Sequence, residues 1–289
     1  MKNIKEEDKK GIPFLETGKR FLAYFDVMGF KDFVYRNKHK AVKKRMDAIS
    51  AIVKRIEEYE LNNFSKKSDD SSILEIVNKI NESENSDILD ISEEDIKKAV
   101  DSVFDINSTI IHPVIFSDTV VLVSNSNKIS DLFKILVMSS LFIKYLFEQK
   151  SPIPIKGAIS YGEVTVDRNK NIIFGKPLID AYELAEQINF YGAIAHNSFD
   201  SRILKLKKID IVSRKAVENI LRLNTTIKKV HLKSGRITHR LILWNITNDN
   251  QEHINNVIYK FLFTSSGSVR KYVDNSIELY KDIVEENHQ

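Results

Sequence analysis

The chain has 289 residues, 42% of them hydrophobic and 29% charged, which is enough to bury the core of one large domain or two small ones. Its 44 Lys and Arg against 40 Asp and Glu give a formal charge of +4, too small by itself to indicate nucleic-acid binding. Cysteine is absent, which excludes disulfides and cysteine-ligated zinc and is typical of a cytoplasmic protein. No run approaches the roughly 18 apolar residues of a membrane span, so we expect no membrane partner.

The N-terminal part begins with residues 1–19, which mix both charges without an apolar signal sequence and predict a flexible tail. A short apolar strand is predicted at 20–27. Apolar residues at helical spacing then predict one long helix, or two joined helices, ending near Leu61. Residues 62–108 are polar, acidic and rich in Ser and Asn, and predict a mobile insertion in the core domain.

The remaining pattern begins with two β-rich runs that meet at Ser117 and Asp118, and it predicts a hairpin there. The apolar segment 130–149 follows and predicts a buried or interface helix. Downstream the pattern predicts a strand pair, a helix, a strand, a hairpin turning at Ser234 and Gly235, and C-terminal helices. These elements lie at residues 153–175, 176–188, 190–196, 228–246 and 250–285, in that order.

This order of elements predicts an α+β fold of the ferredoxin-like kind, an antiparallel sheet with helices on one face. In such a sheet the end of the first strand and the turn of the next hairpin are neighbours, so Asp26 and Asp118 should meet. Each aspartate alone would be explained as a turn cap. Together they repel each other and are costly to bury, and a divalent cation such as Mg²⁺ removes that cost.

Four segments resemble, in order, those of the class III nucleotidyl cyclases: FDVMGF, FSDTVVLVS, IPIKGAISYGEVTV and FGKPLIDAYELAE. The first is similar to the family's Asp-x-x-Gly-Phe signature, and the third to its Arg-x-Gly-Ile-x-x-Gly strand. The resemblance implies a catalytic domain at 20–248 followed by a helical extension at 249–289. It also implies an enzyme that converts a nucleoside triphosphate to its 3′,5′-cyclic monophosphate and pyrophosphate.

For catalysis the resemblance implies two Mg²⁺ or Mn²⁺ ions held by Asp26, Val27 and Asp118, with the two aspartates as catalytic residues. Such ions stabilise both the attacking and the leaving oxygen of an in-line displacement. The family's transition-state Asn and Arg align with Ile179 and Glu183, which cannot replace them. Their function is therefore missing or supplied by another residue.

For the triphosphate, Gly29 and Phe30 open a helix whose backbone amides are suited to cradle phosphates. The resemblance implies that Lys233 binds the polyphosphate, although a solvated hairpin lysine would look the same in the sequence. Lys156 is predicted to bind substrate, and Lys156 or Lys176 is a candidate for the missing transition-state cation.

The positions with which the family reads its purine hold Val114 and Ile172, and neither can form a hydrogen bond to a purine edge. This chain most resembles the bacterial antiphage pyrimidine cyclases of the Pycsar systems, so we expect UTP or CTP as substrate. Tyr35, Arg36 or Tyr161 would then contact the base.

The cyclase resemblance implies a homodimer, and large apolar residues on more than one face of segment 132–147 favour it. Two other interpretations stay open. One is a degenerate domain that binds nucleotide or a partner without turnover. The other is a palm-like nucleic-acid-binding domain, but its expected basic groove with aromatics is missing, and the lysine-rich 36–45 is typical of a solvated helix. His112 and His196 are predicted to be hydrogen-bonded structural residues.

Overall fold

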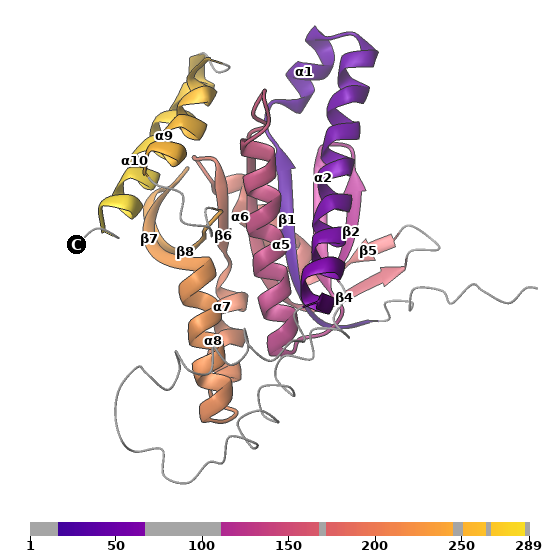
Figure 1. Ribbon diagram of the computed structural model, residues 1–289, viewed down its shortest axis with the longest axis vertical. Helices are drawn as coiled ribbons and strands as arrows, with labels where there is room; N and C mark the ends of the chain where they lie inside the picture. Colours follow the sequence, from indigo (N-terminus) through magenta and orange to yellow (C-terminus); the bar gives the residue numbers. More distant parts are fainter. Residues whose placement is uncertain (1–16, 67–110, 168–171, 245–250, 264–266, 287–289) are drawn as a thin grey trace, which may run out of the picture.

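The computed structural model describes residues 17–66, 111–167, 172–244, 251–263 and 267–286 (Figure 1). Within them the chain forms an α+β fold around an eight-stranded, mostly antiparallel sheet, which confirms the predicted class. The strands are β1 (Gly18–Val27), β2 (Ile111–Phe116), β3 (Thr119–Ser124), β4 (Ile155–Asp167), β5 (Ile172–Phe174), β6 (Gly192–Ala195), β7 (Thr225–Leu232) and β8 (Gly235–Ile242). The α-helices are α1 (Phe30–Arg36), α2 (His39–Lys66), α5 (Ile129–Phe147), α6 (Lys176–Gln187), α7 (Asn197–Leu206), α8 (Ile211–Asn224), α9 (Gln251–Lys260) and α10 (Arg270–Glu286).

The sheet has the strand order β2-β3-β1-β4-β6-β8-β7, with β5 paired to β4 alone. The described pairs are antiparallel apart from β4 and β6, which run parallel and are joined through α6. The register places Asp26 of β1 between Thr119 of β3 and Lys156 of β4. Polar side chains from three adjacent strands therefore meet at one end of the sheet's centre.

One face of the sheet carries the main core. Alternate residues of β1, Phe21, Ala23 and Phe25, point to this face, where α2, α5, α7, α8, α9 and α10 supply the packing partners. The ring of Phe25 lies 5.0 Å from that of Phe142 on α5, centroid to centroid. The C-terminal helices belong to this core as well, through residues such as Val257.

Helix α5 packs on the sheet inside this core, with α2 on one side of it and α8 on the other (Figure 1). Most of its side chains are buried within the one chain. The expectation that this apolar helix supplies homodimer contacts is therefore wrong, because its apolar surface is already used. None of the helices in the described part of the chain is long and apolar enough to span a membrane.

The opposite face of the sheet is covered by α6. Leu22 and Tyr24 of β1 point to this face and form a smaller apolar cluster with Ala181 and Ala185 of α6. This corrects the prediction that the helices lie on one face only. The physical reason is the sequence of β1, which is apolar at consecutive positions, so both of its faces must be shielded from water.

Several boundaries differ from the prediction. The first helical region consists of two joined helices, as one of the two predicted alternatives has it, because Asn37 is extended between α1 and α2. Helix α2 continues to Lys66 rather than ending near Leu61. Helices α7 and α8 had no predicted counterpart. Residues 1–16 of the predicted tail and 67–110, which hold most of the predicted insertion, lie outside the described residues, and the division into domains stays a prediction.

Candidate functional site

The two predicted aspartates meet at the end of β1. Asp118 lies in the two-residue turn between β2 and β3, and its carbonyl accepts a hydrogen bond of 2.9 Å from the amide of Val27. The turn depends on Ser117, whose φ of 53° is unusual for a residue other than glycine and is suited to a tight hairpin. The sequence-based expectation that Asp26 and Asp118 are neighbours is confirmed.

The carboxyl group of Asp26 is in an unfavourable place for a negative charge. Burial raises its pKa above the ordinary value, and the charges of Asp118 and Glu186 act in the same direction. Only the ammonium of Lys156 opposes them. A cation bound beside Asp26 would therefore offset the electrostatic cost of ionising this carboxyl group in the folded protein.

A chain of alternating charges lies next to Asp26. The buried Lys156 has its Nζ 3.7 Å from Asp26 Oδ2 and donates a hydrogen bond to Glu186 Oε1. Lys233 has its Nζ 3.8 Å from Glu186 Oε2, and its backbone amide donates to the carbonyl of Gln187 at 2.7 Å. The hydrogen bond from Lys156 and the charges of both lysines hold the pKa of Glu186 below its usual range. The structure thus brings Lys156 and Lys233 together around a carboxylate.

The predicted phosphate cradle is narrower than the sequence indicated. The amide of Val27 is used by Asp118, and the amide of Met28 donates to the carbonyl of Pro154 at 2.9 Å. Of the predicted cradle, the backbone amides of Gly29 and Phe30, at the start of α1, are the candidates that remain for binding an anion. Gly29 has φ 70°, so glycine is needed there for its conformation.

Tyr161 does not belong to this site. It pairs with Phe21, five positions along β1 from Asp26, which corresponds to roughly 16 Å along the strand. Its hydroxyl accepts a hydrogen bond from Asn127 Nδ2 at 3.2 Å, and the guanidinium of Arg202 lies over its ring. The predicted contact of Tyr161 with the base is therefore not supported within this chain.

An apolar groove of about 410 Å³ adjoins the site on the α6 face of the sheet. It is lined by Tyr24, Val114, Phe116, Thr119, Val121, Ile173, Leu178, Ile179 and Tyr182. Val114, one of the two expected base positions, lies in it, whereas Ile173 takes the place expected for Ile172. Tyr35 and Arg36 have exposed side chains on α1.

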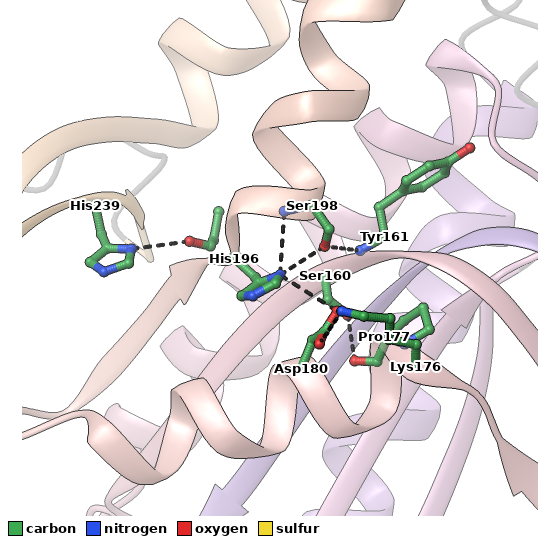
Figure 2. A network of polar contacts seen from close by, with 9 residues as sticks. Ser160, Tyr161, Lys176, Pro177, Asp180, His196, Ser198 and His239 are labelled. Carbon is green, nitrogen blue, oxygen red and sulfur yellow. Dashed lines mark hydrogen bonds and ion pairs between the residues drawn. The ribbon is translucent and has the colours of Figure 1, made fainter.

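His196 forms a network that fixes the start of α6 and α7 (Figure 2). Its Nδ1 lies 2.9 Å from Ser198 Oγ and 3.8 Å from a carboxylate oxygen of Asp180, which also binds the ammonium of Lys176. Ser198 Oγ in turn accepts a hydrogen bond from the amide of Tyr161. Burial lowers the pKa of His196. The prediction of a hydrogen-bonded structural histidine is confirmed.

The donor atoms of the site fit a hard divalent cation. No group of three or more His, Asp or Glu that could hold a metal is found among the described residues. The candidate donors that the resemblance implies are the carboxylates of Asp26 and Asp118 and the backbone carbonyl of Val27. Few oxygen ligands, completed by water and phosphates, are what Mg²⁺ requires. The residues present therefore fit Mg²⁺ or Mn²⁺ better than a metal that prefers nitrogen or sulfur.

Glu186 is the residue of this site that the sequence interpretation missed. The available signal was Lys156, a lysine within an otherwise apolar strand, because a buried ammonium requires a carboxylate partner. Acidic residues on the helix predicted to follow, Glu183 and Glu186, were the candidates. Only the structure shows that Glu186 is the one that contacts Lys156.

No protein-family model matches the sequence, and a search of curated proteins finds no match. Among solved structures, the adenylyl cyclase CyaB from P. aeruginosa is similar with 12% identity and a TM-score of 0.37, over 82% of this chain and 98% of that one. The guanylate cyclase domain of RhGC from Catenaria anguillulae, in complex with GTP, is similar with 10% identity and a TM-score of 0.40, over 78% and 97%. A bacterial light-regulated adenylyl cyclase has 9% identity and a TM-score of 0.43, over 89% and 58%.

Proposed function

We propose that the protein is a nucleotidyl cyclase that converts a nucleoside triphosphate to its 3′,5′-cyclic monophosphate and pyrophosphate. The observation that carries the proposal is the meeting of Asp26 and Asp118 at the end of β1. Two lysines, Lys156 and Lys233, lie near this pair, and both contact the carboxylate of Glu186. Carboxylates for cations, lysines and helix-start amides for phosphates are the groups that phosphoryl transfer needs.

In this proposal the 3′-oxygen bonds to the α-phosphorus while its proton passes to water. The bond from the α-phosphorus to the bridging oxygen breaks, and pyrophosphate leaves with that oxygen. Two Mg²⁺ or Mn²⁺ ions, when bound, would stabilise the charge on the attacking and leaving oxygens. Asp26 and Asp118 are near each other because the backbone of the β2–β3 turn is hydrogen-bonded to the end of β1, and the charge of Asp118 acts on the carboxyl group of Asp26. The amides of Gly29 and Phe30 face the terminal phosphates, and Lys156 supplies positive charge next to Asp26.

A pyrimidine is the proposed base. The groove beside the site is lined almost entirely by apolar side chains, and the polar edge of a purine would be left unpaired in it. Each buried polar group without a partner costs about 1 to 3 kcal/mol. The smaller UTP or CTP leaves fewer such groups unpaired, and we propose that the product serves as a signal in antiphage defence, on the strength of the resemblance to Pycsar cyclases.

The test is an incubation of the purified protein with equal concentrations of ATP, GTP, CTP and UTP and with Mn²⁺, followed by identification of the products by mass. We expect cyclic UMP or cyclic CMP as the main product, and none from an Asp118→Asn variant. Cyclic AMP or cyclic GMP as the main product would contradict the pyrimidine proposal while supporting a cyclase.

A homodimer is part of the proposal, with the α6 face of the sheet in place of α5 as its interface. Phe116 and Ile179, both on the groove, have 78% and 57% of their surface exposed, and Phe174 on β5 has 58%. Exposed apolar side chains in one continuous area mark interaction surfaces. The proposed occupant is a second copy, because this area borders Asp26 through Thr119 and the resemblance implies a site between two catalytic domains.

A binding domain without turnover is the second candidate. It is favoured by Ile179 and Glu183, which stand where the resemblance expects the transition-state Asn and Arg and cannot replace them. The two candidates differ in one result. Binding of a triphosphate that depends on Asp26, with no product of any kind under the conditions above, would favour the second.

A further inference from the structure

Lys156 is a buried cation that two carboxylates share. Its side chain is 8% exposed, against 23% for Asp26 and 38% for Glu186. The ammonium donates a hydrogen bond to Glu186, while its 3.7 Å separation from Asp26 Oδ2 is longer than an ordinary N–H···O hydrogen bond. The ammonium therefore lies closer to Glu186 than to the carboxylate that the proposed function assigns to the metal.

We propose that Glu186 is a positioning residue that holds the Lys156 ammonium away from Asp26 and so keeps that carboxylate available to a divalent cation. This inference rests on the proposed function, because it takes Asp26 as a metal ligand. Two positive groups on one carboxylate repel each other at short range, so an ammonium bonded to Asp26 would compete with the cation. By binding the ammonium elsewhere, Glu186 removes the competitor without removing its charge from the site.

The position of Glu186 is fixed by rigid parts of the fold. Its helix, α6, packs on the sheet through Ala181 and Ala185. The amide of Lys233, in the β7–β8 turn, bonds to Gln187, the residue after Glu186. The ammonium of Lys233 then lies near the second oxygen of Glu186. Glu186 is thus held in place and kept ionised. Both properties are needed for its carboxylate to bind the ammonium of Lys156.

The experiment is a titration of the full-length protein with Mn²⁺ alone, without nucleotide, followed by the electron paramagnetic resonance signal of free Mn²⁺. It compares the wild type with Glu186→Gln, Lys156→Met and the double variant. We expect Glu186→Gln to weaken Mn²⁺ binding about tenfold in the wild type but less than about twofold in the Lys156→Met background. The four proteins form a double-mutant cycle, which isolates the coupling between Glu186 and Lys156. Lys156→Met alone should strengthen binding. Thermal melts check folding, and Lys156→Gln replaces Lys156→Met if that variant does not fold.

The control for charge is Glu163→Gln, an exposed glutamate on the same strand as Lys156 but near its other end. It removes one negative charge and should leave Mn²⁺ binding unchanged. Equal weakening by Glu186→Gln in both backgrounds would show that Glu186 acts by its own charge, and no weakening would show that it does not act at all; either overturns the inference. If Asp26→Asn instead binds Mn²⁺ as tightly as the wild type does, the assignment of Asp26 as a metal ligand in the proposed function is overturned.

Discussion

Strand β1 divides its side chains between two faces of the sheet that differ in kind. Phe21 and Phe25 point to a face covered by α2, α5 and further helices, where the described side chains are mostly aliphatic and aromatic. Leu22 and Tyr24 point to a face that α6 covers in part, and Asp26, the last residue but one of the strand, lies near Lys156 and Glu186. One strand thus contributes to stability on the first face and to the proposed chemistry on the second, because its period of two separates them.

The largest expected effect is at the proposed site, at the end of β1. Asp118→Asn keeps the size of the side chain but removes the charge of a metal ligand, and turnover should fall by a factor on the order of 10³, equivalent to about 4 kcal/mol. The measurement is the rate of cyclic nucleotide formation at saturating Mn²⁺ and triphosphate. An Asp118→Asn variant with wild-type turnover would contradict the assignment of the site to this end of β1.

The second effect concerns the exposed area of the α6 face. Phe116→Glu places a charge at an apolar surface that we propose to be covered by a second copy, and the dimer dissociation constant should rise by about two orders of magnitude. Sedimentation velocity over a concentration series measures it. The control is Phe263→Glu, which changes a phenylalanine that is even more exposed, at 89%, in the short helical turn after α9. A wild-type protein that is a monomer at micromolar concentration with full activity would contradict the dimer.

The third effect belongs to the helix-covered face. Phe142→Leu removes the ring that contacts Phe25 and should lower the free energy of unfolding by about 1 to 2 kcal/mol. Urea unfolding measures the change. Mn²⁺ binding by the folded protein should stay as in the wild type, because Phe142 packs in the main core on the helix-covered face of the sheet. A parallel loss of Mn²⁺ affinity would show that the two faces are not independent.

The positions of the two aspartates could be predicted from the sequence because both signals are local. Asp26 ends an apolar strand and Asp118 follows a turn residue between two β-rich runs, and the order of elements makes these ends neighbours. Lys156 was likewise visible as a charge in an apolar strand. Features set by neighbours in sequence, and by the connections between elements, were therefore accessible before the structure.

Other features depend on packing that no local pattern encodes. Glu186 reaches Lys156 because the small residues Ala181 and Ala185 let α6 pack close to the sheet. How a helix packs on a sheet depends on tertiary contacts and not on the local sequence alone. Tyr161 was placed by its motif, although the extended strand carries it far from Asp26. The predicted homodimer contact was wrongly assigned to α5, because high hydrophobicity does not distinguish a helix buried within one chain from a helix at an interface.

The smallest expected effect tests the cost of the charge on Asp26. Its pKa is raised in the folded protein, chiefly by burial, so the folded state holds this proton more tightly than the unfolded state does. The stability of the metal-free wild type relative to Asp26→Asn is therefore highest below the ordinary aspartate pKa near 4 and is lost as the pH rises through the folded pKa. At pH 7 in a chelator, Asp26→Asn should unfold at a higher urea concentration than the wild type, and at pH 3 the difference should vanish. Saturating Mn²⁺ should reverse the order at pH 7, because only the wild type gains the binding energy of the ion; an unchanged order would mean that no cation is held at this end of β1.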